Sequence, residues 1–139
     1  MISFIPAVNS SAAALDAERT RLEVISQNIA NANTTRGVDG KAYQRQQVVF
    51  ESVLRQAGGN LAVPELRVSN IVKDQRPPRL VFNPGHPDAD EQGMVAMPNV
   101  NIHEEMADMI VASRAFEANL AVIKNARQLA MQALSIGKR

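Results

Sequence analysis

Two short segments combine histidine with carboxylate side chains, the residue types that bind metals or transfer protons. The first is the loop sequence NPGHPDADE at 83–91, with His86, Asp88 and Asp90. Alternating acids suit a hard cation, but the spaced glycine and terminal glutamate of a calcium loop are missing. The second, at 103–105, has no second histidine four residues on, as a helical zinc motif requires. We therefore expect a solvated acidic turn with His86 in a local hydrogen bond, no catalytic or metal site, no cofactor and no enzyme activity.

The charge and composition argue against several other functions. The formal net charge is only +1, and the basic residues are dispersed without aromatic neighbours that stack on bases, so we expect no nucleic-acid partner. Cysteine is absent, which removes disulfides and thiolate catalysis. No stretch approaches the ~20 consecutive apolar residues of a membrane span, and the N-terminus lacks the basic start and apolar run of a cleaved signal peptide. We expect neither direct membrane insertion nor signal cleavage.

The elements that position these residues are dominated by one long helix near the C-terminus. The segment 101–136 contains neither Gly nor Pro and is rich in strong helix formers. Asn101 followed by Glu104 predicts an N-cap, and Gly137 predicts the helix end. At ~1.5 Å per residue, such a helix is roughly 50 Å long.

This C-terminal helix carries two apolar stripes. A surface helix of a monomer needs only one. We therefore expect one stripe to pack within the chain and the other, roughly 150° around the helix, to pack against neighbouring subunits. The first stripe contains Met106, Met109, Phe116, Leu120, Ile123 and Leu134. The predicted subunit interface on the second stripe consists of Val111, Val122, Leu129 and Ile136.

A second helix is predicted at 7–32, where apolar residues recur one heptad apart and Glu18 interrupts the repeat. Sustained heptads favour a paired-helix seam. We predict a mainly α fold in which the two long helices pair as an antiparallel, coiled-coil-like hairpin. The predicted intrachain seam consists of Leu15, Leu22, Ile25 and Ile29 from the first helix and Met109, Phe116, Leu120 and Ile123 from the second.

The middle of the chain has a different composition, since six of the seven Gly and six of the seven Pro lie in 36–100. Such a segment favours turns and short strands over helices. We predict a small loop-rich β insertion that projects from the helix pair and divides the chain into regions 1–35, 36–100 and 101–139. The predicted strands are 42–51, 66–73 and 79–82, with a weaker candidate at 94–97 and turns at 56–60 and 77–78.

Three asparagines lie close together where the first helix should end: Asn28, Asn31 and Asn33. Amide side chains compete for backbone hydrogen bonds inside a helix. Near a helix C-terminus they cap the last carbonyls, and asparagine tolerates the left-handed conformation. We expect these residues to define the helix end and its junction with the insertion.

The segment LEVISQNIANANTT at 22–35 resembles the N-terminal signature of the bacterial flagellar rod, hook and hook-filament axial proteins. The order PGHPDAD, PNVN, EEM and SRAFEAN between residues 84 and 119 is similar to the proximal-rod members of that family. The resemblance covers 10–136, although 54–66 carries no motif that matches. The axial-family motif residues are Asn28, Ile29, Ala30, Asn31, Asn33 and Thr34.

The resemblance implies a structural subunit of the proximal rod. Such proteins are exported unfolded through the flagellar type III apparatus, without a cleaved signal peptide, and polymerise in the periplasm. The implied partners are further copies, neighbouring proximal and distal rod subunits, and the adaptor between the MS ring and the rod. The implied assembly is a helical tube that transmits motor torque and encloses the export channel. An alternative is a secreted helical-hairpin effector or chaperone, which would not need the second apolar stripe.

Overall fold

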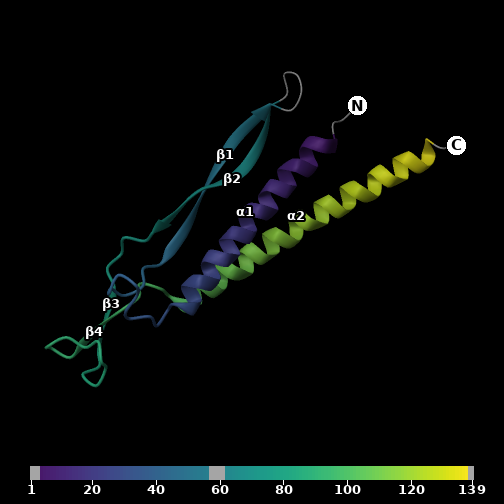
Figure 1. Ribbon diagram of the computed structural model, residues 1–139. Helices are drawn as coiled ribbons and strands as arrows, with labels where there is room; N and C mark the ends of the chain where they lie inside the picture. The colour runs from purple at the N-terminus through teal and green to yellow at the C-terminus, as the bar shows by residue number, and fades with distance from the viewer. Residues whose placement is uncertain (1–3, 57–61, 138–139) are drawn as a thin grey trace.

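The computed structural model describes residues 4–56 and 62–137. The chain begins with one long helix, α1 (Phe4–Ala30), and ends with another, α2 (Ile102–Ile136). Four strands lie between them in the sequence. The helices lie side by side, and the N-terminal end of α1 and the C-terminal end of α2 lie at the same end of an elongated molecule (Figure 1). The predicted mainly α fold, with a small β insertion between two long helices, is confirmed. The strands are β1 (Gln46–Gln56), β2 (Ala62–Lys73), β3 (Arg79–Phe82) and β4 (Met94–Met97).

The ends of α2 follow the capping residues in the sequence. Asn101 is the N-cap, and its side-chain oxygen accepts a hydrogen bond from the His103 N–H at 3.1 Å. Its amide nitrogen donates to Glu104 Oε1 at 3.2 Å. Gly137 is the C-cap, and its N–H donates to the carbonyl of Ala133. The bonds of the His103 and Gly137 N–H groups satisfy backbone groups at the two helix ends, and the bond to Glu104 fixes the Asn101 side chain in place.

The end of α1 differs in one respect from the prediction. The helix ends at Ala30, and Asn31 Nδ2 donates back to the carbonyl of Gln27 at 2.9 Å. Asparagine therefore caps α1 through its side chain, without the left-handed backbone that we expected. Among the described residues, only Gly40 and Gly93 have positive φ angles.

The strands form two separate two-stranded sheets. In each, the two strands are antiparallel, and the β1–β2 register shifts between Val49 and Phe50. The bounds of β3 and β4 are those predicted. β1 begins at Gln46 instead of 42, and β1 and β2 both extend into the 54–66 segment that carried no recognisable motif. Most of the turn predicted at 56–60 lies outside the described residues.

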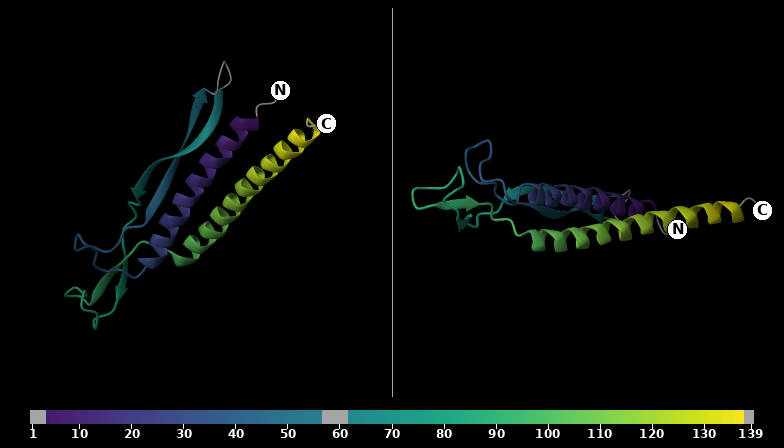
Figure 2. Two further views of the ribbon diagram at one scale, coloured as in Figure 1. Left: turned by 45° about the vertical axis from the view of Figure 1, so that its right-hand side comes forward. Right: turned by 90° about the horizontal axis from the view of Figure 1, so that it is seen from below.

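The β1–β2 hairpin does not project from the helices. It lies along α1, so that α1 is the middle layer between the hairpin and α2 (Figures 1 and 2). Ser10 Oγ donates to the carbonyl of Pro64 at 3.0 Å across this contact. The prediction of a projecting insertion was wrong for this hairpin, because an isolated two-stranded ribbon is marginal and gains burial on a helix. The β3–β4 ribbon with its loops and the loop that follows α1 extend beyond the helix pair (Figure 2).

The buried residues of described α2 are Glu105, Ala112 and Ala126, which are separated by one heptad and then by two. The first apolar stripe was therefore predicted wrongly at its two ends. Met106 is 53% exposed because it lies one residue around the helix from Glu105, and Leu134 is 71% exposed beyond the last buried position. Of the eight predicted seam residues, Ile25 is buried, Leu120 is exposed, and Leu15, Leu22, Ile29, Met109, Phe116 and Ile123 are half-buried.

Candidate assembly site

A buried polar junction joins both helices to the base of the β1–β2 hairpin. Asn28, only 1% exposed, is at its centre. Its Oδ1 accepts hydrogen bonds from the Tyr43 hydroxyl and the Gln46 N–H, each at 2.9 Å. Its Nδ2 donates to the Gln46 carbonyl at 2.8 Å and to Glu105 Oε2 at 2.9 Å. The four bonds satisfy the donors and acceptors of the amide, so Asn28 ties α1 to β1 and α2 at one point.

The charge of Glu105 is balanced by Arg45, which immediately precedes β1. The Glu105 side chain is completely buried, and its Oε1 pairs with Arg45 Nε. The Arg45 guanidinium also lies 3.4 Å from Asp108 Oδ2 and 3.8 Å from Asp74 Oδ2. A buried ion pair is tolerated only where further hydrogen bonds satisfy both partners, and loss of one partner is costly. The junction meets that condition with Asn28 on one carboxylate oxygen and Arg45 on the other.

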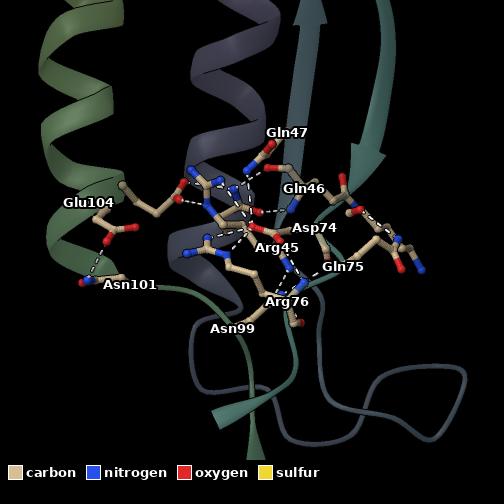
Figure 3. Close-up of polar contacts among 12 residues, drawn as sticks. Arg45, Gln46, Gln47, Asp74, Gln75, Arg76, Asn99, Asn101 and Glu104 are labelled. Atoms are coloured by element: carbon tan, nitrogen blue, oxygen red, sulfur yellow. Dashed lines mark hydrogen bonds and ion pairs between the residues drawn. The ribbon is translucent and has the colours of Figure 1, made fainter.

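A second group of contacts extends the junction toward β3 (Figure 3). Asp74 Oδ2 accepts from Arg76 Nε at 2.8 Å, and this bond is the main reason why the pKa of Asp74 lies below its usual value. The same bond raises the pKa of Arg76. Asn99 Oδ1 accepts from the Arg45 N–H at 2.8 Å, and its Nδ2 donates to the Arg76 carbonyl at 2.9 Å. The segments before β1, after β2 and before α2 are thereby held together.

Tyr43 is the only tyrosine in the chain, and its hydroxyl belongs to this junction through its bond to Asn28. Burial raises the pKa of its hydroxyl, and the nearby Glu105 carboxylate raises it further, because both oppose formation of a second negative charge.

Sequence reasoning found Asn28 but missed its charged partner Glu105 and the cation Arg45 that pairs with Glu105. A signal for Glu105 was present, since it lies seven residues before Ala112 on the inward face of α2. A carboxylate at a seam position requires a partner when buried. No comparable signal in the sequence indicated Arg45, because its partner is 60 residues away.

The acidic loop at 83–91 is held by local bonds. His86 Nδ1 accepts the Asp88 N–H at 3.1 Å, which is the local hydrogen bond that we expected. The Asp88 carboxylate accepts from Thr35 Oγ1 at 2.8 Å and pairs with Arg36, so it fastens the loop to the segment after α1. Asp90 Oδ1 accepts two backbone N–H groups of the same loop. Within the described residues, no group of three or more histidine and carboxylate side chains could hold a metal ion.

The other motif residues are also near this junction. Asn31 accepts from Thr34 Oγ1 at 3.2 Å, in addition to its bond to the carbonyl of Gln27. Ile29 is half-buried, while Ala30 and Asn33 are exposed. The asparagines thus differ in role, and only Asn28 reaches the strand and the second helix.

The four predicted interface residues are all solvent-exposed on α2. Val111, Val122, Leu129 and Ile136 are 56%, 48%, 53% and 76% exposed. After Ala126, no residue of described α2 is buried, and the helix extends past the N-terminal end of α1 (Figure 2, right). No helix in the described ranges has the length and apolar character needed to cross a membrane. An apolar face of this kind suits helix packing between subunits.

Comparisons with known proteins agree with this arrangement. Residues 9–36 match the family described as "Flagella basal body rod protein", and residues 91–136 match "Flagellar basal body rod FlgEFG protein C-terminal". The matches cover most of α1 and all of α2, together with the motif at 28–34. The two-helix fold and these matches define a structural protein of the flagellar basal-body rod.

Three relatives, each named "Flagellar basal-body rod protein FlgC", match nearly the whole chain. The identity is 41% with the protein of Borreliella burgdorferi, covering 93% of this chain and 94% of the relative. It is 39% with that of Yersinia enterocolitica, covering 99% and 100%. It is 38% with that of Bacillus subtilis, covering 94% and 96%. The chain therefore belongs to the FlgC family of flagellar basal-body rod proteins.

Proposed function

We propose that this protein is a proximal-rod subunit that polymerises through its terminal helices into a tubular drive shaft. The shaft transmits motor torque and encloses the export channel. The observation that carries the proposal is that α2 has one face packed on α1 and a second apolar face open along its length. In this proposal, α1 and α2 form an antiparallel, coiled-coil-like seam within the subunit. The open face, with Val111, Val122, Leu129 and Ile136, packs against neighbouring subunits.

The proposed mechanism is mechanical. Long helices that share apolar faces distribute shear over many contacts. At ~25 cal/mol per Å², a few hundred Å² of apolar surface per neighbour contributes several kcal/mol before ordering costs. The buried junction around Asn28 and Glu105 adds a rigid connection between the helix pair and the hairpin. Torque that reaches the helices is thereby passed to the insertion.

We further propose the partners and the location that the FlgC relationship suggests. The partners are further copies, neighbouring proximal and distal rod subunits, the adaptor between the MS ring and the rod, and the type III export apparatus. The subunit is exported without a cleaved signal peptide and assembles in the periplasmic part of the basal body. The names of the relatives support the rod assignment. The division into regions 1–35, 36–100 and 101–139 stays a prediction.

A single charge in the open face of α2 tests the proposal. Val122→Asp should block incorporation into basal bodies while leaving export intact, because the carboxylate would be buried without a partner in the subunit seam. Ser26→Asp, a charge at an exposed polar position of α1, should leave incorporation unchanged. Incorporation is measured by immunoblotting of purified basal bodies, with motility as a second readout.

Normal rods built from the Val122→Asp variant would contradict the assigned interface. If the unaltered protein were absent from purified basal bodies and ran as a discrete soluble species, the effector or chaperone alternative would replace the rod assignment.

A further inference from the structure

Two exposed apolar surfaces lie at opposite ends of the molecule. The first, the β3 patch, consists of Leu80, Val81 and Phe82, and Phe82 is 68% exposed. The second, the α2 tail, consists of Leu129, Met131, Leu134 and Ile136. Because the two ends are far apart in the elongated fold (Figures 1 and 2), these surfaces cannot meet within one chain.

The α2 tail and the loop that follows β3 carry opposite charge, although β3 itself begins with a cation, Arg79. After Glu117 the sequence contains four basic residues, Lys124, Arg127, Lys138 and Arg139, and no acidic residue. The loop 83–93 between β3 and β4 contains Asp88, Asp90 and Glu91 and no Lys or Arg. Asp88 is already paired with Arg36, which leaves Glu91 as an exposed acid of the loop. The charges therefore favour contact between the α2 tail and this loop, which lies beside the β3 patch.

The form of β3 favours contact through its side chains over addition of another strand. It has four residues and is preceded directly by Pro77 and Pro78, and prolines near an edge strand oppose further backbone pairing. All four side chains of β3 are exposed, however, so the strand offers an apolar surface to a helix.

We propose that the α2 tail of one copy docks on the β3 patch of a second copy, with Arg127 facing the acidic loop. This inference rests on the proposed rod function and names the surface that receives the open end of α2. Because the two surfaces differ, the contact is heterologous, and such contacts build rings or open helical filaments instead of two-fold dimers.

Cysteine crosslinking in cells tests the contact, since the chain has no native cysteine. Cells that express Phe82→Cys and Leu134→Cys variants together should yield a disulfide-linked dimer in purified basal bodies that exceeds the homodimers from either variant alone. Ser26→Cys, at an exposed position of α1, replaces Phe82→Cys in the control and should give no such dimer.

A charge exchange tests the same contact independently. Glu91→Lys in the Phe82→Cys variant should lower the dimer yield about fivefold, the size expected for one or two exposed ion pairs. Arg127→Glu in the Leu134→Cys variant should restore it, which a merely structural effect of Glu91→Lys would not allow. No loss of yield, or a loss without restoration, would overturn the contact.

The outcomes separate this inference from the proposed function. If the protein enters basal bodies but Leu134→Cys crosslinks only to other rod proteins or to other positions, the docking site is wrong and the rod assignment stands. If the protein is absent from basal bodies, both are overturned.

Discussion

The buried pair between Arg45 and Glu105 leads to the sharpest prediction about stability. Arg45→Met keeps most of the aliphatic stem but removes the cation from the carboxylate of Glu105, which is completely buried. The carboxylate would keep one hydrogen bond, from Asn28 Nδ2 at 2.9 Å. The variant therefore leaves a buried charge with a single polar partner.

The expected loss in free energy of unfolding depends on the polar groups that still surround the Glu105 carboxylate in the variant. Removal of one member of a buried ion pair typically costs ~3–5 kcal/mol. Because Asn28 still compensates part of the charge, we expect a value near the lower limit, ~3 kcal/mol. For a chain of this size, each kcal/mol lowers the unfolding midpoint by roughly 3–4 °C, so the shift should be on the order of 10 °C.

Thermal and urea unfolding of the purified chain, followed by circular dichroism, measures this effect. Arg19→Met is the matched control, because the pair between Arg19 and Glu23 is 68% and 60% exposed. Exposed pairs of this type contribute at most ~0.5 kcal/mol. Glu105→Gln added to Arg45→Met should recover part of the loss, since the buried group is then neutral. An Arg45→Met variant as stable as Arg19→Met would refute the reasoning.

Two further predictions concern the titration of the junction. Glu105→Gln should move the pKa of Tyr43 down toward its ordinary value, because the charge of the carboxylate is one of the two causes that raise it. Absorbance titration of the single tyrosine measures this, and an unchanged pKa would contradict the assigned effect of the Glu105 charge. The lowered pKa of Asp74 means that its charge stabilises the fold at neutral pH and that this contribution is lost as the pH falls through the folded-state value. Asp74→Asn should therefore weaken the fold at neutral pH and flatten the loss of stability below about pH 4, as measured by urea unfolding at several pH values. If the stability of Asp74→Asn and that of the unaltered protein depended on pH in the same way, the role assigned to Asp74 would be wrong.

The local elements could be predicted because their signals lie within a few residues of each other. The cap at Asn101, the stop at Gly137 and the strands β3 and β4 depend on short-range sequence, and the structure confirms them. The bounds of β1 and β2 were less accurate. Both strands continue because they pair with each other as far as Gln56 and Ala62, and this pairing stabilises residues whose own preference for a strand is weak.

The position of the hairpin depended on tertiary contacts. Its apolar face could have been covered by α1, by α2 or by another chain, and the sequence pattern did not distinguish these. The observed packing places α1 in the middle layer, in contact with both the hairpin and α2.

The two long helices and the loop-rich insertion could be predicted from the amino-acid sequence alone. The resemblance to flagellar axial proteins, carried by residues 22–35 and 84–119, could be recognised in the same way. Helical periodicity and capping are local, and family motifs need no coordinates to be recognised. Which polar side chains meet where the two helices join the hairpin could be seen only in the tertiary structure. Asn28, Arg45 and Glu105 are up to 77 residues apart, and their bonds form only when α1, the segment before β1 and α2 meet at the base of the hairpin. Burial makes those bonds specific, because each of these polar groups is stable away from water only with its partners in place.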